Sequence, residues 1–222
     1  MNFDESGFEV IDNILTQDEV QHLLLALETQ QLTALRGGIR RIEQLLSEVE
    51  HLAKSEMILA LAQNYLTAPA QFVRAIYFDK NPENNWLVSW HQDRTVSVSD
   101  RFEKSGWGPW SLKADAWHVQ PPLEVLENMI TIRLNLDASS RSNGCLKFIP
   151  GSHRDGIIKT AQVAAHLHDK TAVYCAAPAG SAVLMRPHIF HASEKATSPA
   201  NRRVLHFEYT SYSLPEGIAW SA

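Results

Sequence analysis

Residues 130–137, ITIRLNLD, alternate apolar and polar side chains without a break. Successive side chains of a β-strand point to opposite faces, so the alternation predicts a strand with one apolar and one polar face. Residues 202–208, RRVLHFE, are similar, with Arg202, His206 and Glu208 sharing a face with Val204. A polar face can be solvated or can line a pocket inside a sandwich. We expect the pocket, because it places Arg202 in the same cavity as the metal motif described below.

The rest of the chain divides into a helical part and a strand-rich part. Residues 1–69 predict helices after a short strand at 8–11, with Thr16 and Glu19 forming a capping box and apolar residues at helical spacing over 42–52 and 57–66. From residue 70 to 212, short runs of β-branched and aromatic residues alternate with Pro, Gly and Asn. The strands that we expect here are 71–79, 86–91, 94–98, 130–137, 145–149, 172–176, 182–186 and 202–210. The sequence therefore predicts one α+β domain over 1–222, with helices packed on one sheet of a β-sandwich or jelly roll.

Composition excludes several classes of function. The 222 residues are 45% apolar and 20% charged, as in an ordinary globular domain. The net charge of −5 gives no general attraction to nucleic acid or to an anionic membrane. There is no stretch of 18 apolar residues and no signal-peptide pattern. Cys145 and Cys175 lie in apolar surroundings, which indicates free thiols in a reducing compartment and a cytoplasmic protein. The sequence predicts no oligomeric state.

The segment Trp90–Asp93, WHQD, contains a candidate metal motif. His91 and Asp93 stand at positions i and i+2 at the end of a predicted strand, so both side chains can reach one ion. A distant histidine would complete a set of two imidazoles and one carboxylate, which in non-haem Fe(II) oxygenases leaves three metal positions open. His188 and His191 face opposite ways on a strand, and we assign His191 as the ligand. A non-catalytic cupin-like metal or small-molecule binding protein and a zinc hydrolase are the alternatives.

Arg202 follows His191 by eleven residues. A guanidinium binds a carboxylate through two parallel hydrogen bonds, so Arg202 would suit a dicarboxylate cosubstrate. Neither alternative function needs an arginine at this position. The spacing therefore favours the oxygenase.

Three motifs together resemble the phytanoyl-CoA dioxygenase family of Fe(II)/2-oxoglutarate oxygenases. They are NGCLKFIPGSH at 143–153, WHQD at 90–93, and LMRPHIFHAS at 184–193 with its following Arg-Arg pair. The resemblance implies a double-stranded β-helix that binds Fe(II) through His91, Asp93 and His191. It also implies that Arg202, helped by Ser193, binds the C5-carboxylate of 2-oxoglutarate, with Arg203 as the alternative if the last strand is rotated.

The resemblance further implies a reaction in which O₂ and 2-oxoglutarate yield succinate and CO₂ while a small-molecule substrate is oxidised. Halogenases of the family replace the carboxylate ligand with a small residue, so Asp93 favours hydroxylation of an unactivated C–H bond. The chain is shorter than the members that give the family its name, so an acyl-CoA substrate does not follow. Arg133 and Asn135 share the expected pocket face and are candidates for binding the C1-carboxylate or the substrate.

Residues 99–124 combine three tryptophans with Gly106, Gly108 and Pro109. This composition predicts a long irregular loop, and such loops are often lids. We expect a mobile lid that shapes the substrate pocket, although the tryptophans could instead pin the loop to the sheet. The candidate substrate residues are Trp107, Trp110, Lys113 and His118.

Overall fold

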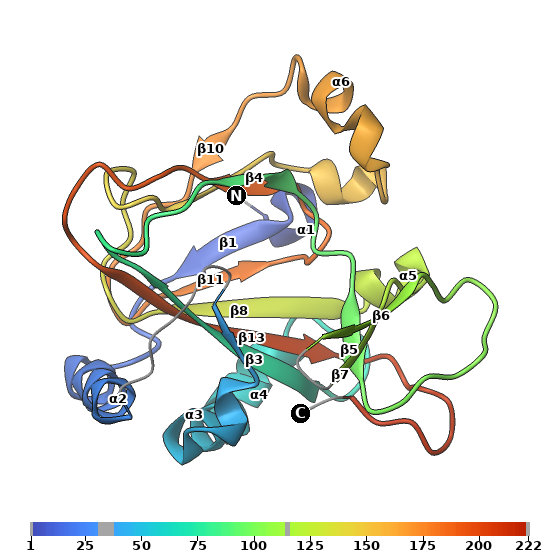
Figure 1. The fold of residues 1–222 in the computed structure, drawn as a ribbon, viewed down its shortest axis with the longest axis horizontal. Helices are drawn as coiled ribbons and strands as arrows, with labels where there is room; N and C mark the ends of the chain where they lie inside the picture. The colour runs from blue at the N-terminus through green and yellow to red at the C-terminus, as the bar shows by residue number, and fades with distance from the viewer. Residues whose placement is uncertain (1, 31–37, 114–115, 221–222) are drawn as a thin grey trace.

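The computed structural model describes residues 2–30, 38–113 and 116–220, which form a jelly roll whose large sheet is covered by helices on its outer face (Figure 1). In the six-stranded sheet the order is β1 (Phe8–Ile11), β11 (Ala182–Met185), β8 (Met129–Asn135), β13 (Arg202–Thr210), β3 (Gln71–Lys80) and β2 (Ile39–Arg40). In the four-stranded sheet it is β10 (Val173–Tyr174), β9 (Leu146–Phe148), β12 (His191–Ser193) and β4 (Val88–His91). All neighbouring strands in both sheets are antiparallel. The expected jelly roll and the expected strands are confirmed.

Three helices cover the outer face of the large sheet and lie together below it in Figure 1: α2 (Gln17–Thr29), α3 (Ser47–Ala53) and α4 (Glu56–Gln63). The short helix α1 (Phe3–Ser6) lies beside the edge strand β1. Thr16 and Glu19 form the predicted capping box at the start of α2. Ile130, Ile132 and Leu134 of β8 are fully buried in the cluster that these helices form with the sheet. Each such side chain contributes about 1.5–3 kcal/mol, so the apolar face of the alternating strand fixes which way its polar face points.

The segment 42–52 is less regular than its apolar spacing predicts. It contains a 3₁₀ turn, η1 (Ile42–Gln44), and then α3, with Leu46 in an extended conformation between them. Arg41 adopts a left-handed conformation with φ 57°, which prevents a helix from starting earlier. The Glu43 carboxylate then accepts a hydrogen bond from the backbone N–H of Ala75 in β3. This hydrogen bond fixes the 3₁₀ turn to β3, and the segment therefore does not form one continuous helix.

Our expectation of an irregular loop over residues 99–124 holds for 99–109, which contain no helix or strand, and is wrong for the rest. The second half contains β6 (Trp110–Lys113) and β7 (Ala116–Val119), and β7 pairs with both β6 and β5 (Val96–Val98) in a third antiparallel sheet. The helix α5 (Leu123–Glu127) follows. The glycines and Pro109 lie in the irregular first half, directly before β6, and the apolar side chains of the region build a core of their own with Val125, Leu126 and Met129.

The remaining short helices are η2 (Ser152–Asp155), η3 (Thr160–Gln162) and α6 (Val163–Leu167). Both cysteines are buried and free. Within the described ranges, no helix has the length and apolar character needed to cross a membrane.

Candidate metal centre and cavity

Three side chains from adjacent parts of the small sheet converge on one point. His91 ends β4 and His191 begins β12, and the two residues are direct partners in the antiparallel register. Asp93 lies two residues beyond β4, where its backbone N–H donates to the carbonyl of Pro187. The Asp93 carboxylate oxygens lie 3.6 Å from Nε2 of His91 and 3.6 Å from Nε2 of His191. The sequence predicted all three residues, and the fold brings them together.

Both imidazoles are oriented as metal ligands. Nδ1 of His91 lies 2.9 Å from the carbonyl oxygen of Ser89, and Nδ1 of His191 lies 2.9 Å from that of Ile189. A carbonyl only accepts, so Nδ1 carries a hydrogen in each ring and Nε2 is the atom left for a metal. Burial lowers the pKa of His191 to about 3, which keeps this ring neutral. Burial alone would raise the pKa of Asp93, but the two neighbouring imidazoles hold it below its usual range and keep the carboxylate ionised.

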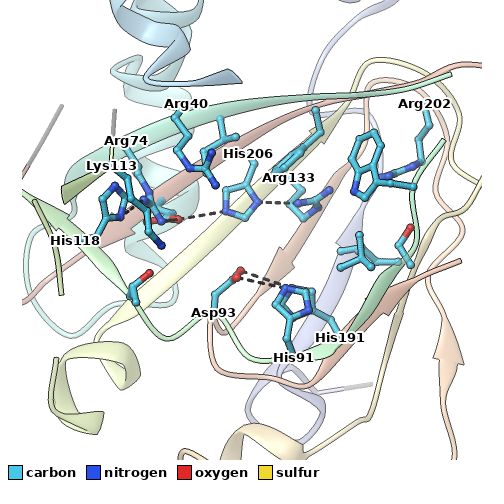
Figure 2. Close-up of a pocket in the computed structure, with 18 residues that line it drawn as sticks. Arg40, Arg74, His91, Asp93, Lys113, His118, Arg133, His191, Arg202 and His206 are labelled. Carbon is cyan, nitrogen blue, oxygen red and sulfur yellow. Dashed lines mark hydrogen bonds and ion pairs between the residues drawn. The ribbon is translucent and has the colours of Figure 1, made fainter. Parts of the chain in front are cut away.

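These ligand atoms open into a cavity of about 290 Å³ between the two sheets. Figure 2 shows Arg202 at one end of this cavity and Arg40, Lys113 and His118 at the other, with the three ligands between them. The lining comes from both sheets and from the third sheet, and consists of Arg40, Arg74, Ile76, Phe78, Trp86, Val88, His91, Asp93, Thr95, Lys113, His118, Arg133, Leu146, His191, Ser193, Arg202, His206 and Glu208.

Arg202 is buried in this cavity without a protein partner for its Nε atom among the described residues. Its exposed fraction is only 3%, and burial lowers its pKa to about 10, so it remains charged at neutral pH. Arg203 points the opposite way, where Asp137 accepts hydrogen bonds from it at 2.9 Å through both carboxylate oxygens, and Glu28 accepts a third. The strand is therefore not rotated, and Arg202 is the arginine that a ligand in the cavity would meet.

Ser193 lines the cavity beside Arg202, but its hydroxyl is already engaged. Its Oγ accepts a hydrogen bond from Nζ of Lys80 at 2.7 Å and donates to the carbonyl of Gly144 at 2.7 Å. Lys80 is completely buried and also donates to the carbonyl of Glu194. The sequence analysis did not identify Lys80. Its signal is its place at the end of β3, where the antiparallel register pairs it with Arg202.

A chain of polar contacts crosses the cavity wall on the large sheet. Arg133 donates from Nη1 to Nδ1 of His206 at 2.7 Å, and Nε2 of His206 lies 3.4 Å from the carboxylate of Glu208. That carboxylate accepts two hydrogen bonds from Arg74, at 2.7 and 2.9 Å. Arg74 also donates to Nδ1 of His118 at 3.3 Å. Arg74 was missed in the sequence, although it alternates with Ile76 and Phe78 on the face of β3 that lines the cavity.

The other predicted site residues separate into two groups. Arg133, Lys113 and His118 line the cavity. Asn135 does not: it is buried, and its amide donates to Oγ of Ser181, at the end of the neighbouring segment before β11. Trp107 and Trp110 do not either, because both rings pack edge-on against Phe102 in the core of the third sheet. The structure therefore gives no support to a ligand role for Asn135 or for these two tryptophans.

Comparison with known proteins gives a family and a fold. The profile of the phytanoyl-CoA dioxygenase (PhyH) family matches residues 3–204. A phytanoyl-CoA dioxygenase domain-containing protein 1 from Danio rerio is 27% identical over 207 residues, which span 86% of this chain and 60% of that relative. The chain thus corresponds to little more than half of the length of this relative.

Similar solved structures come from enzymes with different reactions. The 2-oxoglutarate-dependent carbocyclase SnoK from nogalamycin biosynthesis has a TM-score of 0.72 and 18% identity, covering 94% of this chain and 81% of its own. The epimerase SnoN has a TM-score of 0.70 and 15% identity, with coverages of 98% and 81%. HygX from Streptomyces hygroscopicus, solved with nickel, 2-oxoglutarate and hygromycin B, has a TM-score of 0.69 and 15% identity, with coverages of 96% and 86%. At this level of identity the likeness establishes the fold.

Proposed function

Since the chain belongs to the phytanoyl-CoA dioxygenase family, we propose that it is a single-domain non-haem Fe(II)/2-oxoglutarate-dependent oxygenase acting on a small molecule. The observation that carries this proposal is the combination, in one cavity, of the His91–Asp93–His191 set with the buried Arg202, whose Nε has no partner among the residues that the structure describes. A buried guanidinium without a partner is costly, so its presence indicates an anionic ligand.

The donor set suits Fe(II). Two neutral imidazoles and one carboxylate form the set that this metal takes in oxygenases, and it leaves positions for a bidentate cosubstrate and O₂. His91, Asp93 and His191 would hold the ion, with the carbonyls of Ser89 and Ile189 fixing both rings in orientation. When bound, iron together with 2-oxoglutarate and O₂ supplies the oxidising power that removes hydrogen from a substrate C–H bond.

The chain's own residues bind and orient the cosubstrate. Arg202 would bind the C5-carboxylate of 2-oxoglutarate at its end of the cavity, and this orientation directs the other end of the molecule towards the ligands. Ser193 could join Arg202 only by turning its hydroxyl hydrogen away from Gly144, which its bond from Lys80 permits. Arg133 lies between Arg202 and the ligands and is our candidate for the C1-carboxylate (Figure 2).

We propose hydroxylation as the outcome. Asp93 retains the carboxylate ligand, which leaves no coordination position for a halide. Epimerisation and cyclisation, the reactions in the names of SnoN and SnoK, are other outcomes of the same kind of oxidation. Incorporation of one atom of ¹⁸O from ¹⁸O₂ into the product would identify hydroxylation, whereas an oxidised product without label would exclude it.

The test of the oxygenase itself needs no knowledge of the substrate. Fe(II) and 2-oxoglutarate are added to the protein without O₂, and the weak visible charge-transfer band of the chelate is measured. Admission of O₂ should then give slow formation of succinate. A protein that binds iron but forms neither the band nor succinate would be a binding protein and not an oxygenase.

We also place the protein in the cytoplasm, on the strength of its two free buried thiols.

A further inference from the structure

We propose that the substrate carries an anionic group, a carboxylate or a phosphate, which Arg40 and Lys113 bind at the end of the cavity opposite Arg202. This inference rests on the proposed function and adds the chemical class of the substrate. Figure 2 shows that the Arg40 and Lys113 side chains project towards the same end of the cavity, beyond the three metal ligands as seen from Arg202.

The first argument is the charge of the cavity. Five cationic side chains line it, and only the two carboxylates Asp93 and Glu208 oppose them; the cations are Arg40, Arg74, Lys113, Arg133 and Arg202. Fe(II) and doubly charged 2-oxoglutarate cancel each other when both are bound. An excess of three positive charges therefore remains in a protein whose net charge is −5. Concentrated charge of one sign inside a cleft attracts a ligand of the opposite sign.

The second argument is which of these cations already have partners. Arg74 is neutralised by Glu208 through two hydrogen bonds. Arg133 donates to His206 and lies over the ring of Phe78, with 5.3 Å from the guanidinium carbon to the ring centroid. Across the described ranges, by contrast, neither Arg40 nor Lys113 has a hydrogen bond or an ion pair from its side chain. A ligand that reaches these two groups therefore displaces no partner among the described residues.

Neighbouring neutral groups fit the same ligand. Arg74 donates to Nδ1 of His118, so the hydrogen of this imidazole is on Nε2. Burial, reinforced by the nearby cations, lowers the pKa of His118 to about 4, so the ring stays neutral and offers one N–H donor. Of the apolar lining, Ile76 is the register partner of Arg40, whereas Trp86, Val88 and Leu146 lie beside Lys80 or Ser193 at the Arg202 end. The ligand that the Arg40 end fits is a small molecule with one anionic group.

The test uses the protein loaded with Mn(II) and saturating 2-oxoglutarate, and measures paramagnetic relaxation of small probes by NMR. The probes are 3-phenylpropanoate, its neutral amide 3-phenylpropanamide, and phenyl phosphate. The same protein loaded with Zn(II) gives the diamagnetic blank. We expect the protons of at least one of the two anions, and not those of the amide, to relax faster near the metal. The anion with the larger relaxation enhancement shows whether the site prefers a carboxylate or a phosphate.

The variant Arg40→Ala/Lys113→Ala should raise the dissociation constant of that anion by about tenfold or more, since hydrogen bonds to charged groups are among the stronger ones. Lys54→Ala/Lys159→Ala removes the same charge from exposed positions outside the cavity and should change nothing. Equal binding of the amide, unchanged binding by the first variant, or no relaxation of either anion would overturn the inference.

The chelate band of Fe(II) and 2-oxoglutarate separates this result from the proposed function. The Arg40→Ala/Lys113→Ala variant should keep the band, because neither side chain lies at the cosubstrate end. If the wild-type protein forms the band but binds neither anionic probe, only the proposal of an anionic substrate is refuted. Absence of the band from the wild-type protein refutes the oxygenase, and the binding of anions is then judged on its own.

Discussion

Replacement of Arg202 by methionine should separate ligand binding from stability. Methionine keeps most of the length and apolar surface of the arginine stem but removes the guanidinium. Loss of a charge-assisted bidentate contact costs about 2–4 kcal/mol, so the dissociation constant of 2-oxoglutarate should rise roughly 30- to 1000-fold. The Fe(II) site should remain, because no atom of Arg202 belongs to it.

The same change should leave the ligand-free protein at least as stable as the wild type. Arg202 is 3% exposed, and its Nε has no partner in the part of the chain that the structure describes. Burial lowers its pKa from 12.5 to about 10, and at about 1.4 kcal/mol per pH unit a shift of this size corresponds to roughly 3 kcal/mol of destabilisation. Relaxation of the cavity reduces this destabilisation, so the free energy of unfolding of Arg202→Met should exceed that of the wild type by about 1 kcal/mol or equal it.

Arg203→Met is the matched control, one residue along the same strand. Its guanidinium is paired with Asp137 and Glu28 on the opposite face. We expect it to lower the free energy of unfolding and to leave 2-oxoglutarate affinity within threefold of the wild type. The assays are urea unfolding without ligand and anaerobic titration of the Fe(II) protein with 2-oxoglutarate. An Arg202→Met protein that binds 2-oxoglutarate normally would refute the clamp, and a large loss of stability would refute the claim that this guanidinium is unsatisfied.

Three further changes test other parts of the site and fold. Asp93→Ala should abolish Fe(II) binding in equilibrium dialysis, and retained stoichiometric iron would move the metal elsewhere. Lys80 has its pKa lowered to about 7, chiefly by burial. The unfolded chain therefore holds this proton more tightly, and the free energy of unfolding should rise between pH 7 and 10 by up to about 1.4 kcal/mol per pH unit; Lys80→Met should flatten that rise, and identical pH profiles would contradict it. Trp107→Ala should lower the free energy of unfolding by about 3–5 kcal/mol without changing 2-oxoglutarate affinity. Weaker 2-oxoglutarate binding in a fully stable protein would instead indicate that this ring contributes to the cavity.

The sequence predicts the central strands well because their faces differ in chemistry. Alternation in 130–137 and 202–208 assigns each residue to a face, and both apolar faces lie under the helices as expected. The same alternation explains why Arg202 could be placed on the cavity side of its strand. His91 and Asp93 could be anticipated from their i, i+2 spacing at the end of a predicted strand. The pairing of His191 with His91 across β12 and β4 is supplied by the fold.

The rim of the cavity could not be predicted in the same way. Arg40 stands in a two-residue strand, and Lys113 ends a strand in a region whose glycines and proline suggested a loop. Their approach to one another depends on how three sheets are placed in space, which local periodicity does not contain. The prediction that Trp107 and Trp110 contact the substrate failed for a related reason, because an aromatic residue in a Gly-rich segment can pack in a small core as well as in a ligand pocket.

The division between central and edge strands has a consequence for how relatives of this protein can diverge. His191 and the polar chain of Arg74, Arg133, His206 and Glu208 sit on β12, β3, β8 and β13, each of which is hydrogen-bonded to a strand on both sides. His91 ends the edge strand β4, but its imidazole shares the metal set with Asp93 and His191, so a change at any of these positions disturbs several partners at once. The two cations at the far end sit instead on short edge strands, where exposed side chains can be exchanged at little cost to folding. On the function and the substrate site that we propose, new substrate preferences can therefore arise by substitution at these two positions without any change in the metal ligands.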